Sequence, residues 1–488
     1  MTFIRLPFVI LLLITYSLWL LCKGRERYRA RLLVLLVASV VFYGHDDWWF
    51  VFVLCAYGVV DWAVGRWIVR APHARMALAL GIAFNLGVLV YWKYAPLLLR
   101  TLHPMLGIAD PARVEGSWII PFGVSFYSFT GIAYMVDVYR RTTPAETNLL
   151  RCMLHLAFFP HLMAGPILRA REFLVHLRPD RMPDRPQAPR EAALLLARGF
   201  FKKMVLANRI GIAIDPFFLH VGEPPTAGVW SMPFLYLYAF QIYLDFSGYT
   251  DIARGLALFF GFRWPDNFNL PYLAASPREF WQRWHITLSQ FLRDYLYIPL
   301  GGNRVGGWRA QVNVMITMLL GGLWHGGNWS FLLWGGLHGG YVVAHRVWAA
   351  SRLRRDLWQR SAAVAWVFRP VAIALTFNVV CLTWCFFRLT ALRQSLACLR
   401  SCFVFDADKL FSSGSGDISL WALLSIYGAI VLAAHWFKPF LQPMIRDVAP
   451  RRTTFAHGFA WGVALTVLTL AVLLAPNGET PPFIYFQF

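Results

Sequence analysis

Residues 319–341 read LLGGLWHGGNWSFLLWGGLHGGY, an apolar stretch that is unusually rich in glycine. It contains four Gly-Gly pairs within 20 residues, and Lys, Arg, Asp and Glu are all missing from it. Glycine costs about 1 kcal/mol relative to alanine in an exposed helix. In a membrane, however, small residues let neighbouring helices approach closely, and they let a backbone pass near a ligand. The stretch therefore predicts closely packed membrane helices.

Two histidines, His325 and His338, lie inside this apolar stretch. An ionisable side chain within a membrane segment indicates function by default, and a neutral imidazole can accept a proton from a hydroxyl or thiol. The two residues are 13 positions apart, about 220° around one helix, so at most one of them lines a given cavity. A structural histidine bonded to a neighbouring carbonyl is the favoured interpretation of His338. For His325 both interpretations stay open.

The composition of the whole chain agrees with a membrane location. Apolar residues make up 58% of the 488 residues, and charged residues only 15%, against about 25% in a typical soluble domain. This excludes a cytosolic globular enzyme, a disordered protein and a disulfide-stapled secreted module. The seven cysteines form no CxxC motif, so neither a disulfide framework nor a zinc site is expected. We predict one all-α, multi-pass membrane domain over residues 1–488, with about 11–13 helices.

The formal net charge of +21 has two possible explanations. Nucleic-acid binding is disfavoured because the basic residues are spread through short loops rather than clustered on one polar domain. The positive-inside rule explains them as cytoplasmic loops, of which 23–31, 346–369 and 438–452 are examples. Residues 6–22 then form a retained anchor. Both termini are predicted to be periplasmic, and the aromatic tail 481–488 is expected to be external and packed against the protein or a partner.

The interval between Arg151 and Arg169 does not fit a simple count of crossings. Both ends look cytoplasmic, yet the 17 residues between them are too few for two spans and include Pro160, Gly165 and Pro166. A re-entrant segment would explain the interval, because irregular backbone survives at membrane depth when it is packed inside protein. The alternative is that one end lies on the other side of the membrane.

A second charged stretch, residues 276–299, reads SPREFWQRWHITLSQFLRDYLYIP and cannot span. Ser276, Pro277 and Glu279 form a capping box with a proline at the first helical position, and Pro299 marks a stop. We therefore predict one amphipathic helix along the membrane boundary. On a helical projection, His285 falls on the apolar face with the tryptophans. It is either a core histidine or a functional one.

Two aspartates, Asp245 and Asp251, are also set in apolar sequence. Each could orient a catalytic histidine, pair with a basic residue such as Arg254, or cap a helix broken near Ser247-Gly248. Structural pairing is the favoured interpretation. A GxSxG motif and a Walker A motif are both missing from the sequence, so neither a serine hydrolase nor ATP-driven transport is supported.

Five stretches of this sequence resemble membrane-bound O-acyltransferases, most closely the bacterial branch that O-acetylates alginate and more distantly the proteins that D-alanylate teichoic acid. The resemblance extends from near the N-terminus to FIYFQF at the end. The stretches are PFGVSFYSFTGIAYMVDVYR (121–140), LMAGPILR (162–169), YLDFSGYTDIARG (243–255), FWQRWHITLSQFLRDYLYIPLGGNR (280–304) and GGLWHGGNWSFLLWGGLHG (321–339).

The resemblance implies a ring of tilted and re-entrant helices around a thin central funnel. It implies an acyltransferase of the bacterial inner membrane that takes an acetyl group from cytoplasmic acetyl-CoA and passes it across the membrane. A periplasmic SGNH-type acetyltransferase would receive the group and modify an exopolysaccharide such as alginate or cellulose. Acetyl-CoA is a substrate here, and neither a bound cofactor nor a metal is expected.

The resemblance also assigns residues: His325 as the catalytic histidine and His285 as a second functional one. Trp324, Asn328 or backbone N–H donors are predicted to hold the thioester carbonyl, and Asp245 and Arg283 complete the predicted substrate-binding residues. Two other classes of function stay open, a polysaccharide transporter or flippase and a scaffold of a secretion complex. A transporter of this kind is expected to show internal repeats, and we see none in the sequence.

Overall fold

The computed structural model describes residues 3, 5–70, 72–106, 119–222, 230–351, 362–404 and 483. Within these ranges every regular element is a helix, which confirms the predicted all-α class. The chain divides into two compact units, residues 1–196 with 250–265 and residues 197–249 with 266–488. The ring-like arrangement and the single domain over 1–488 stay predictions. The segment 438–452 and most of the tail 481–488 lie outside the described residues.

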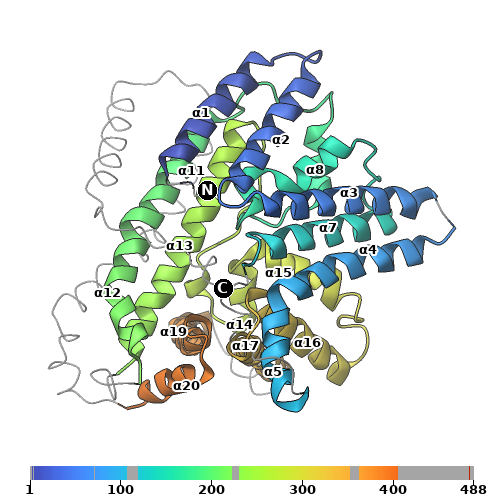
Figure 1. The fold of residues 1–488 in the computed structure, drawn as a ribbon. Helices are drawn as coiled ribbons and strands as arrows, with labels where there is room; N and C mark the ends of the chain where they lie inside the picture. The colour runs from blue at the N-terminus through green and yellow to red at the C-terminus, as the bar shows by residue number, and fades with distance from the viewer. Residues whose placement is uncertain are drawn as a thin grey trace, which may run out of the picture. The chain divides into compact units, whose positions relative to one another are not determined.

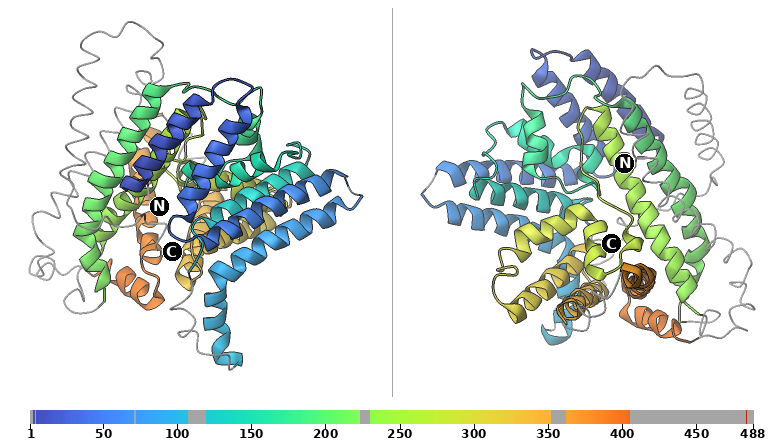
Figure 2. Two further views of the ribbon diagram at one scale, coloured as in Figure 1. Left: turned by 45° about the horizontal axis from the view of Figure 1, so that its top comes forward. Right: turned by 180° about the vertical axis from the view of Figure 1, so that it is seen from behind.

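The first unit begins with helices that are joined by short connections. Its elements are α1 (Leu6–Leu21), α2 (Tyr28–Gly44), α3 (Trp49–Arg70), α4 (Ala74–Leu89), η1 (Val90–Tyr94), α5 (Ala95–Leu106), α7 (Val124–Tyr139), α8 (Leu149–Ala157), α9 (Phe159–Leu162), α10 (Ala170–Phe173), η2 (Leu174–Leu177) and most of α11 (Pro189–Phe200). Helices α3, α4 and α7 pack against one another and lie side by side in Figures 1 and 2.

A buried polar cluster joins these three helices. Asp61 on α3 accepts a hydrogen bond from Asn85 Nδ2 on α4 at 2.8 Å. The Tyr57 hydroxyl donates to the Asn85 carbonyl at 3.1 Å and lies 2.9 Å from Ser128 Oγ on α7. Because hydrocarbon offers no partners for polar groups, these side chains fix how the three helices pack.

Three helical stretches of the described chain are long and apolar enough to cross a membrane: Trp49–Arg70, Ala74–Leu102 and Phe368–Arg388. The shorter Leu6–Leu21 is also apolar and coincides with the predicted anchor at residues 6–22. These helices agree with the prediction of a multi-pass membrane protein.

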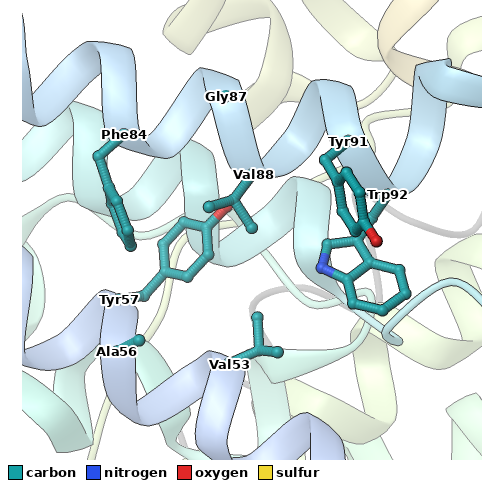
Figure 3. Close-up of a pocket in the computed structure, with 8 residues that line it drawn as sticks. All are labelled: Val53, Ala56, Tyr57, Phe84, Gly87, Val88, Tyr91 and Trp92. Atoms are coloured by element: carbon teal, nitrogen blue, oxygen red, sulfur yellow. The ribbon is translucent and has the colours of Figure 1, made fainter.

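An apolar cavity of about 340 Å³ lies between α3 and the continuous α4–η1 helix (Figure 3). Tyrosine is the only titratable residue type in its lining, so the cavity offers no acid–base chemistry near pH 7. The lining residues are Val53, Ala56, Tyr57, Phe84, Gly87, Val88, Tyr91 and Trp92.

The interval between Arg151 and Arg169 is folded as two short helices followed by irregular backbone. Helix α8 ends at Ala157, α9 covers only Phe159–Leu162, and nearly all residues from 152 to 168 are buried. Helix α8 has nine residues, about 14 Å at 1.5 Å per residue, which is less than half the hydrocarbon thickness. This agrees with a re-entrant segment packed inside protein, while its depth in the membrane stays a prediction.

The second unit contains most of α13 (Met232–Phe259), η3 (Phe201–Ala207), α12 (Asn208–Leu219), η4 (Pro271–Leu273), α14 (Pro277–Arg283), α15 (Ile286–Leu292), η5 (Arg293–Tyr297), α16 (Gly307–His325), α17 (Trp329–Ala350), α19 (Ala362–Arg388) and α20 (Leu392–Ser401). Its main core is formed by buried side chains of α12, α13, α14, α17, α19 and α20. Helix α13 is continuous, so the idea of a helix broken near Ser247-Gly248 is wrong.

Helices α16 and α17 form a hairpin whose close approach depends on glycine. A Cβ on Gly322 would lie 2.3 Å from the Phe331 carbonyl oxygen, and a Cβ on Gly335 would lie 2.3 Å from the Met318 carbonyl oxygen. Both obstacles are backbone atoms, which cannot rotate away. Gly322 and Gly335, one member each of two Gly-Gly pairs, therefore do what the sequence predicts and bring two helices into backbone contact.

In the part of the chain that the structure describes, three short segments are π-helical: η1, η3 and η5. Each carries at least one basic residue, Lys93 in η1, Lys202 and Lys203 in η3, and Arg293 in η5. A π-helical turn is rare and usually interrupts an otherwise α-helical element at a functional or strained position. Each of the three continues a flanking α-helix without a gap.

Candidate active site

The segment 276–299 begins as predicted but is not one continuous helix. Ser276 Oγ accepts a hydrogen bond from the Glu279 backbone N–H at 3.2 Å, which confirms the predicted cap. Helix α14 then ends at Arg283, and α15 begins at Ile286. His285 lies at the break with φ of +40°, in the left-handed region that a non-glycine residue rarely adopts. The prediction of an unbroken amphipathic helix is wrong at this residue.

A long-range contact to Asn267 explains the break. Asn267 Oδ1 accepts hydrogen bonds from the backbone N–H of Thr287 at 3.1 Å and from the Thr287 hydroxyl at 2.9 Å. The Asn267 carbonyl oxygen also accepts from the backbone N–H of Ile286 at 2.9 Å. Asn267 therefore serves the free N–H groups at the start of α15, which a continuous helix would satisfy internally.

The same contact determines which ring nitrogen of His285 carries the proton. The Nδ1 atom of His285 lies 3.2 Å from Asn267 Oδ1. Because the backbone N–H of Thr287 can only donate, the Asn267 atom facing it must be the carbonyl oxygen, and His285 must donate from Nδ1. Nε2 then carries a lone pair, and within the described ranges it makes no hydrogen bond. His285 is thus held as a neutral base at Nε2.

Aromatic side chains enclose His285. Its ring lies edge-on to Phe246 at 4.7 Å and to Trp324 at 5.9 Å between ring centroids. The imidazole is fully buried, and burial lowers the pKa of His285 to about 3 because the charged form loses its hydration. The side chain is therefore neutral at pH 7.

His325 is the last residue of α16 and is also buried. Its ring lies 5.1 Å from Trp334 and 5.1 Å from Phe387 between centroids. The chain leaves the helix at Gly326, where a Cβ would lie 2.1 Å from the Phe331 ring. The glycine that follows His325 is therefore required by packing, and the WHG sequence places this imidazole at a helix end.

Trp324 brings the two histidines together. The centroid of its indole ring lies 5.9 Å from that of the His285 ring and 4.9 Å from that of the His325 ring. Asn328, three residues after His325, caps α17 by accepting from the backbone N–H of Phe331 at 3.1 Å through Oδ1. Four predicted site residues, His285, Trp324, His325 and Asn328, therefore lie on two adjoining parts of the second unit.

The other two predicted site residues are tied to structural partners. Asp245 forms an ion pair with Lys203, and both side chains are buried. Arg283 donates from Nη2 to Glu279 Oε1 at 2.6 Å and from Nη1 to the Asn269 carbonyl at 3.2 Å. These contacts account for both side chains structurally, so their substrate-binding roles stay predictions.

Asp251 and His338 follow the favoured structural interpretation. Asp251 Oδ1 lies 4.0 Å from Arg254 Nη1. His338 Nε2 lies 3.0 Å from the hydroxyl of Thr383, which donates in turn to the Val380 carbonyl at 2.6 Å. Since that hydroxyl proton is already used, His338 donates from Nε2. Its partner is a hydroxyl rather than the expected carbonyl.

The C-terminal tail reaches this region through Phe483. Its side chain is buried, stacks on Tyr249 at 4.7 Å and lies 5.8 Å from Phe246, the residue that contacts His285. This agrees with the expectation that the tail is packed. Its external position stays a prediction.

Sequence reasoning missed Asn267 and Lys203. Asn267 lies in an irregular stretch 18 residues before His285, and Lys203 lies 42 residues before Asp245. No local pattern links such positions. The one available signal was that buried polar groups need partners, which predicted a partner for Asp245 but not its identity.

The described helices, three of them long and apolar enough to cross a membrane, define the class of protein as an integral membrane protein. Residues 125–390 match the model of the membrane-bound O-acyltransferase family, MBOAT. The chain belongs to this family, and it is an acyltransferase of a bacterial membrane. All six predicted site residues lie inside the matched range.

Known relatives cover three kinds of acceptor. A probable alginate O-acetylase of Azotobacter vinelandii is 35% identical over 94% of this chain and 95% of its own length. A peptidoglycan O-acetyltransferase of Helicobacter pylori is 33% identical over 67% of this chain and 64% of its own. A teichoic acid D-alanyltransferase of Streptococcus thermophilus is 28% identical over 54% of this chain and 67% of its own length.

Metal ligation finds no support in the geometry. Among the described residues, no three His, Cys, Asp or Glu side chains gather closely enough to hold an ion. The expectation that the protein binds no metal stays a prediction.

Proposed function

We propose that this protein moves an acetyl group from cytoplasmic acetyl-CoA across the inner membrane for the O-acetylation of an exopolysaccharide. The observation that carries the proposal is the buried pair of His285 and His325 around Trp324. The names of the alginate O-acetylase and peptidoglycan O-acetyltransferase relatives support acetyl transfer to a polymer hydroxyl. An alginate-like or cellulose-like polymer is the proposed final acceptor.

His325 acts as the general base in this proposal. It takes the proton from an acceptor hydroxyl while that oxygen forms a bond to the thioester carbonyl carbon. The carbon–sulfur bond then breaks, and the proton on His325 passes to the CoA sulfur. The acceptor hydroxyl belongs either to a periplasmic SGNH-type partner or to the polymer itself. In both cases one ester forms and one thioester is lost.

The charge that develops on the carbonyl oxygen needs hydrogen-bond donors. The Trp324 indole N–H and the Asn328 amide Nδ2 can supply them from positions beside His325, and such donors act most strongly in a buried site. His285 supports the reaction as a neutral acceptor at Nε2, because Asn267 holds its proton on Nδ1. Its proposed role is to orient the acceptor hydroxyl.

The sidedness rests on the charge pattern. Residues 346–369 carry six arginines, which the positive-inside rule assigns to the cytoplasm. Helix α17 ends at Ala350, within this basic segment. His325 is the last residue of α16 and therefore lies at the other end of the hairpin, where α16 meets α17. The donor therefore approaches from the Arg-rich end of the hairpin, and both termini are periplasmic in this proposal.

The test uses the purified full chain in nanodiscs with radiolabelled acetyl-CoA and an alginate oligomer, with and without the periplasmic partner. Wild type should release CoA, and His325→Ala should slow release by about 10²–10⁴-fold. His45→Ala, an exposed histidine paired only loosely with Asp46 at 4.0 Å, should leave the rate unchanged. Polymer movement without acetyl-CoA use would indicate a transporter instead. Assembly of a secretion complex with normal acetylation by His325→Ala would indicate a scaffold.

A further inference from the structure

The second unit contains a cavity that has no role in the chemistry proposed above. Its volume is about 400 Å³, and it lies between the α14–α15–η5 segment and the α16–α17 hairpin. Three arginines contribute to its lining, Arg278, Arg293 and Arg346. The cavity therefore combines a concentrated positive charge with a place for a small ligand.

Two of the three arginines form no ion pair with a carboxylate among the residues that the structure describes. Arg293 donates to Asp294 at 2.6 and 3.1 Å, so its charge is compensated. Arg346 donates from both Nη atoms to the Tyr297 hydroxyl, at 3.1 and 3.2 Å, and pairs with no carboxylate in the described ranges. Arg278 makes neither an ion pair nor a hydrogen bond with any described residue. Two guanidinium groups with unused donors favour an anionic ligand.

The rest of the lining is mostly apolar. Val314, Met318 and Val342 form a small buried cluster, and Trp281 packs against it. A ligand that fits both parts of the cavity has an anionic group joined to a less polar body. The Tyr297 hydroxyl donates its own proton to Asn303 Oδ1 at 2.6 Å. Its oxygen is therefore held as the acceptor for the two hydrogen bonds from Arg346. The arginine is therefore held in place before a ligand arrives.

One aromatic layer separates this cavity from the histidines. Trp281 lies 5.7 Å from Trp334, and Trp334 lies 5.1 Å from His325, between ring centroids. Ile286, which follows His285 directly, is also part of the lining. The cavity therefore adjoins the candidate active site without including either imidazole.

We propose that this cavity binds the phosphate group of an amphiphilic phosphate ester through Arg278 and Arg346. The planar guanidinium group of arginine presents several N–H donors in a fixed geometry that matches the oxygens of a phosphate. The phosphate can come from the CoA part of the donor, in which case the inference rests on the proposed function, or from the headgroup of an anionic membrane lipid. A cavity of this size is too small for a polymer chain, so a uronate polymer is an alternative that the test must exclude.

The experiment compares the Arg278→Gln/Arg346→Gln variant with Arg309→Gln, which removes an exposed arginine of α16 outside the lining. Both are purified as full chains in nanodiscs of phosphatidylcholine alone or with phosphatidylglycerol. Arg278→Gln alone is included because the side chain of Arg278 is exposed, so we expect the fold to be kept. The measurements are the KM for acetyl-CoA, inhibition by inorganic pyrophosphate, and phosphatidylglycerol retained by the protein in native mass spectrometry.

A rise in KM of about tenfold with kcat within twofold, relative to Arg309→Gln, supports the donor as the source of the phosphate. Unchanged KM with loss of retained phosphatidylglycerol supports the lipid. If both measurements match those of Arg309→Gln, or if alginate oligomer competes for the cavity in place of pyrophosphate, the inference is overturned. Should wild type consume no acetyl-CoA, the proposed function fails, while the lipid measurement still decides the cavity.

Discussion

The α16–α17 hairpin and the α14–α15 segment each carry one of the two candidate catalytic histidines, but they hold it in opposite ways. The hairpin is regular, and its two backbones touch at Gly322 and Gly335. The α14–α15 segment is broken at His285, where a non-glycine residue has a positive φ. One imidazole is placed by helix packing and the other by an irregular backbone that Asn267 supports.

A local sequence pattern predicts the first arrangement but not the second. Helix packing through glycine depends on residues within one stretch of sequence, and small residues have the same effect in most membrane helices. A broken helix depends on a competitor for its backbone hydrogen bonds. When the competitor is remote, the local pattern still predicts a continuous helix. Strained residues of this kind cluster at functional sites, which agrees with His285 as part of the machinery.

The largest effect is expected from Gly335→Ala, which disrupts the α16–α17 hairpin. Its new Cβ would lie 2.3 Å from the Met318 carbonyl oxygen, so the two helices must separate. We expect a loss at or above the upper end of the about 1–3 kcal/mol that overpacking costs. The measurement is the yield and Tm of monodisperse protein in detergent.

Gly340→Ala is the matched control on the same helix. A Cβ there meets no atom within 4 Å, and alanine is about 1 kcal/mol more favourable than glycine in a helix. Its Tm should equal or exceed that of wild type. If both variants behave alike, the close contact does not hold the hairpin together.

The next largest effect is expected from Asn267→Ala, which removes the support of the helix break at His285. His285 loses the acceptor that keeps its proton on Nδ1, and acetyl transfer should fall about 10²-fold, the lower end of what general acid–base groups contribute. Asn313→Ala is the control, because Asn313 is also buried and donates to the Leu300 carbonyl at 3.0 Å. Equal losses in the two variants would show that only folding was affected.

Asn267→Asp separates positioning from folding more sharply. The carboxylate still accepts from Thr287, but its negative charge stabilises protonated His285 and raises the pKa of the imidazole. Wild-type His285 has a pKa of about 3, so it stays neutral throughout the assay range. In the variant, activity should fall on the acid side and recover as pH rises. An unchanged pH profile of kcat would argue against His285 as a neutral acceptor that the reaction needs.

The smallest effect is expected from Thr383→Val, which tests the contrast between catalytic and structural histidines. The buried Nε2–H of His338 loses its acceptor, which costs about 1–3 kcal/mol of stability. The rate of the folded fraction should stay within twofold of wild type. A loss of activity as large as that of Asn267→Ala would place His338 in the machinery.

The sequence predicted the parts of the fold that depend on neighbouring residues. The glycine contacts of α16 and α17, the Ser276 cap and the structural pairing of Asp251 with Arg254 all follow from local spacing. The break at His285 and the partner of Asp245 could not be predicted this way, since Asn267 and Lys203 are brought there by tertiary folding. The site was therefore predicted as residues but not as an arrangement.

The π-helical segments have a consequence for protein engineering. A π-helical turn closes one residue later than an α-helical turn, so each of η1, η3 and η5 is equivalent to an α-helix with one inserted residue. Deleting a residue there lets the helix return to α-helical bonding without changing its phase beyond the segment. The same deletion in the middle of α16 would turn everything after it by about 100°. We therefore expect a one-residue deletion in η1, η3 or η5 to disturb the following residues less than a deletion in α16, and to displace the basic side chains that these segments carry.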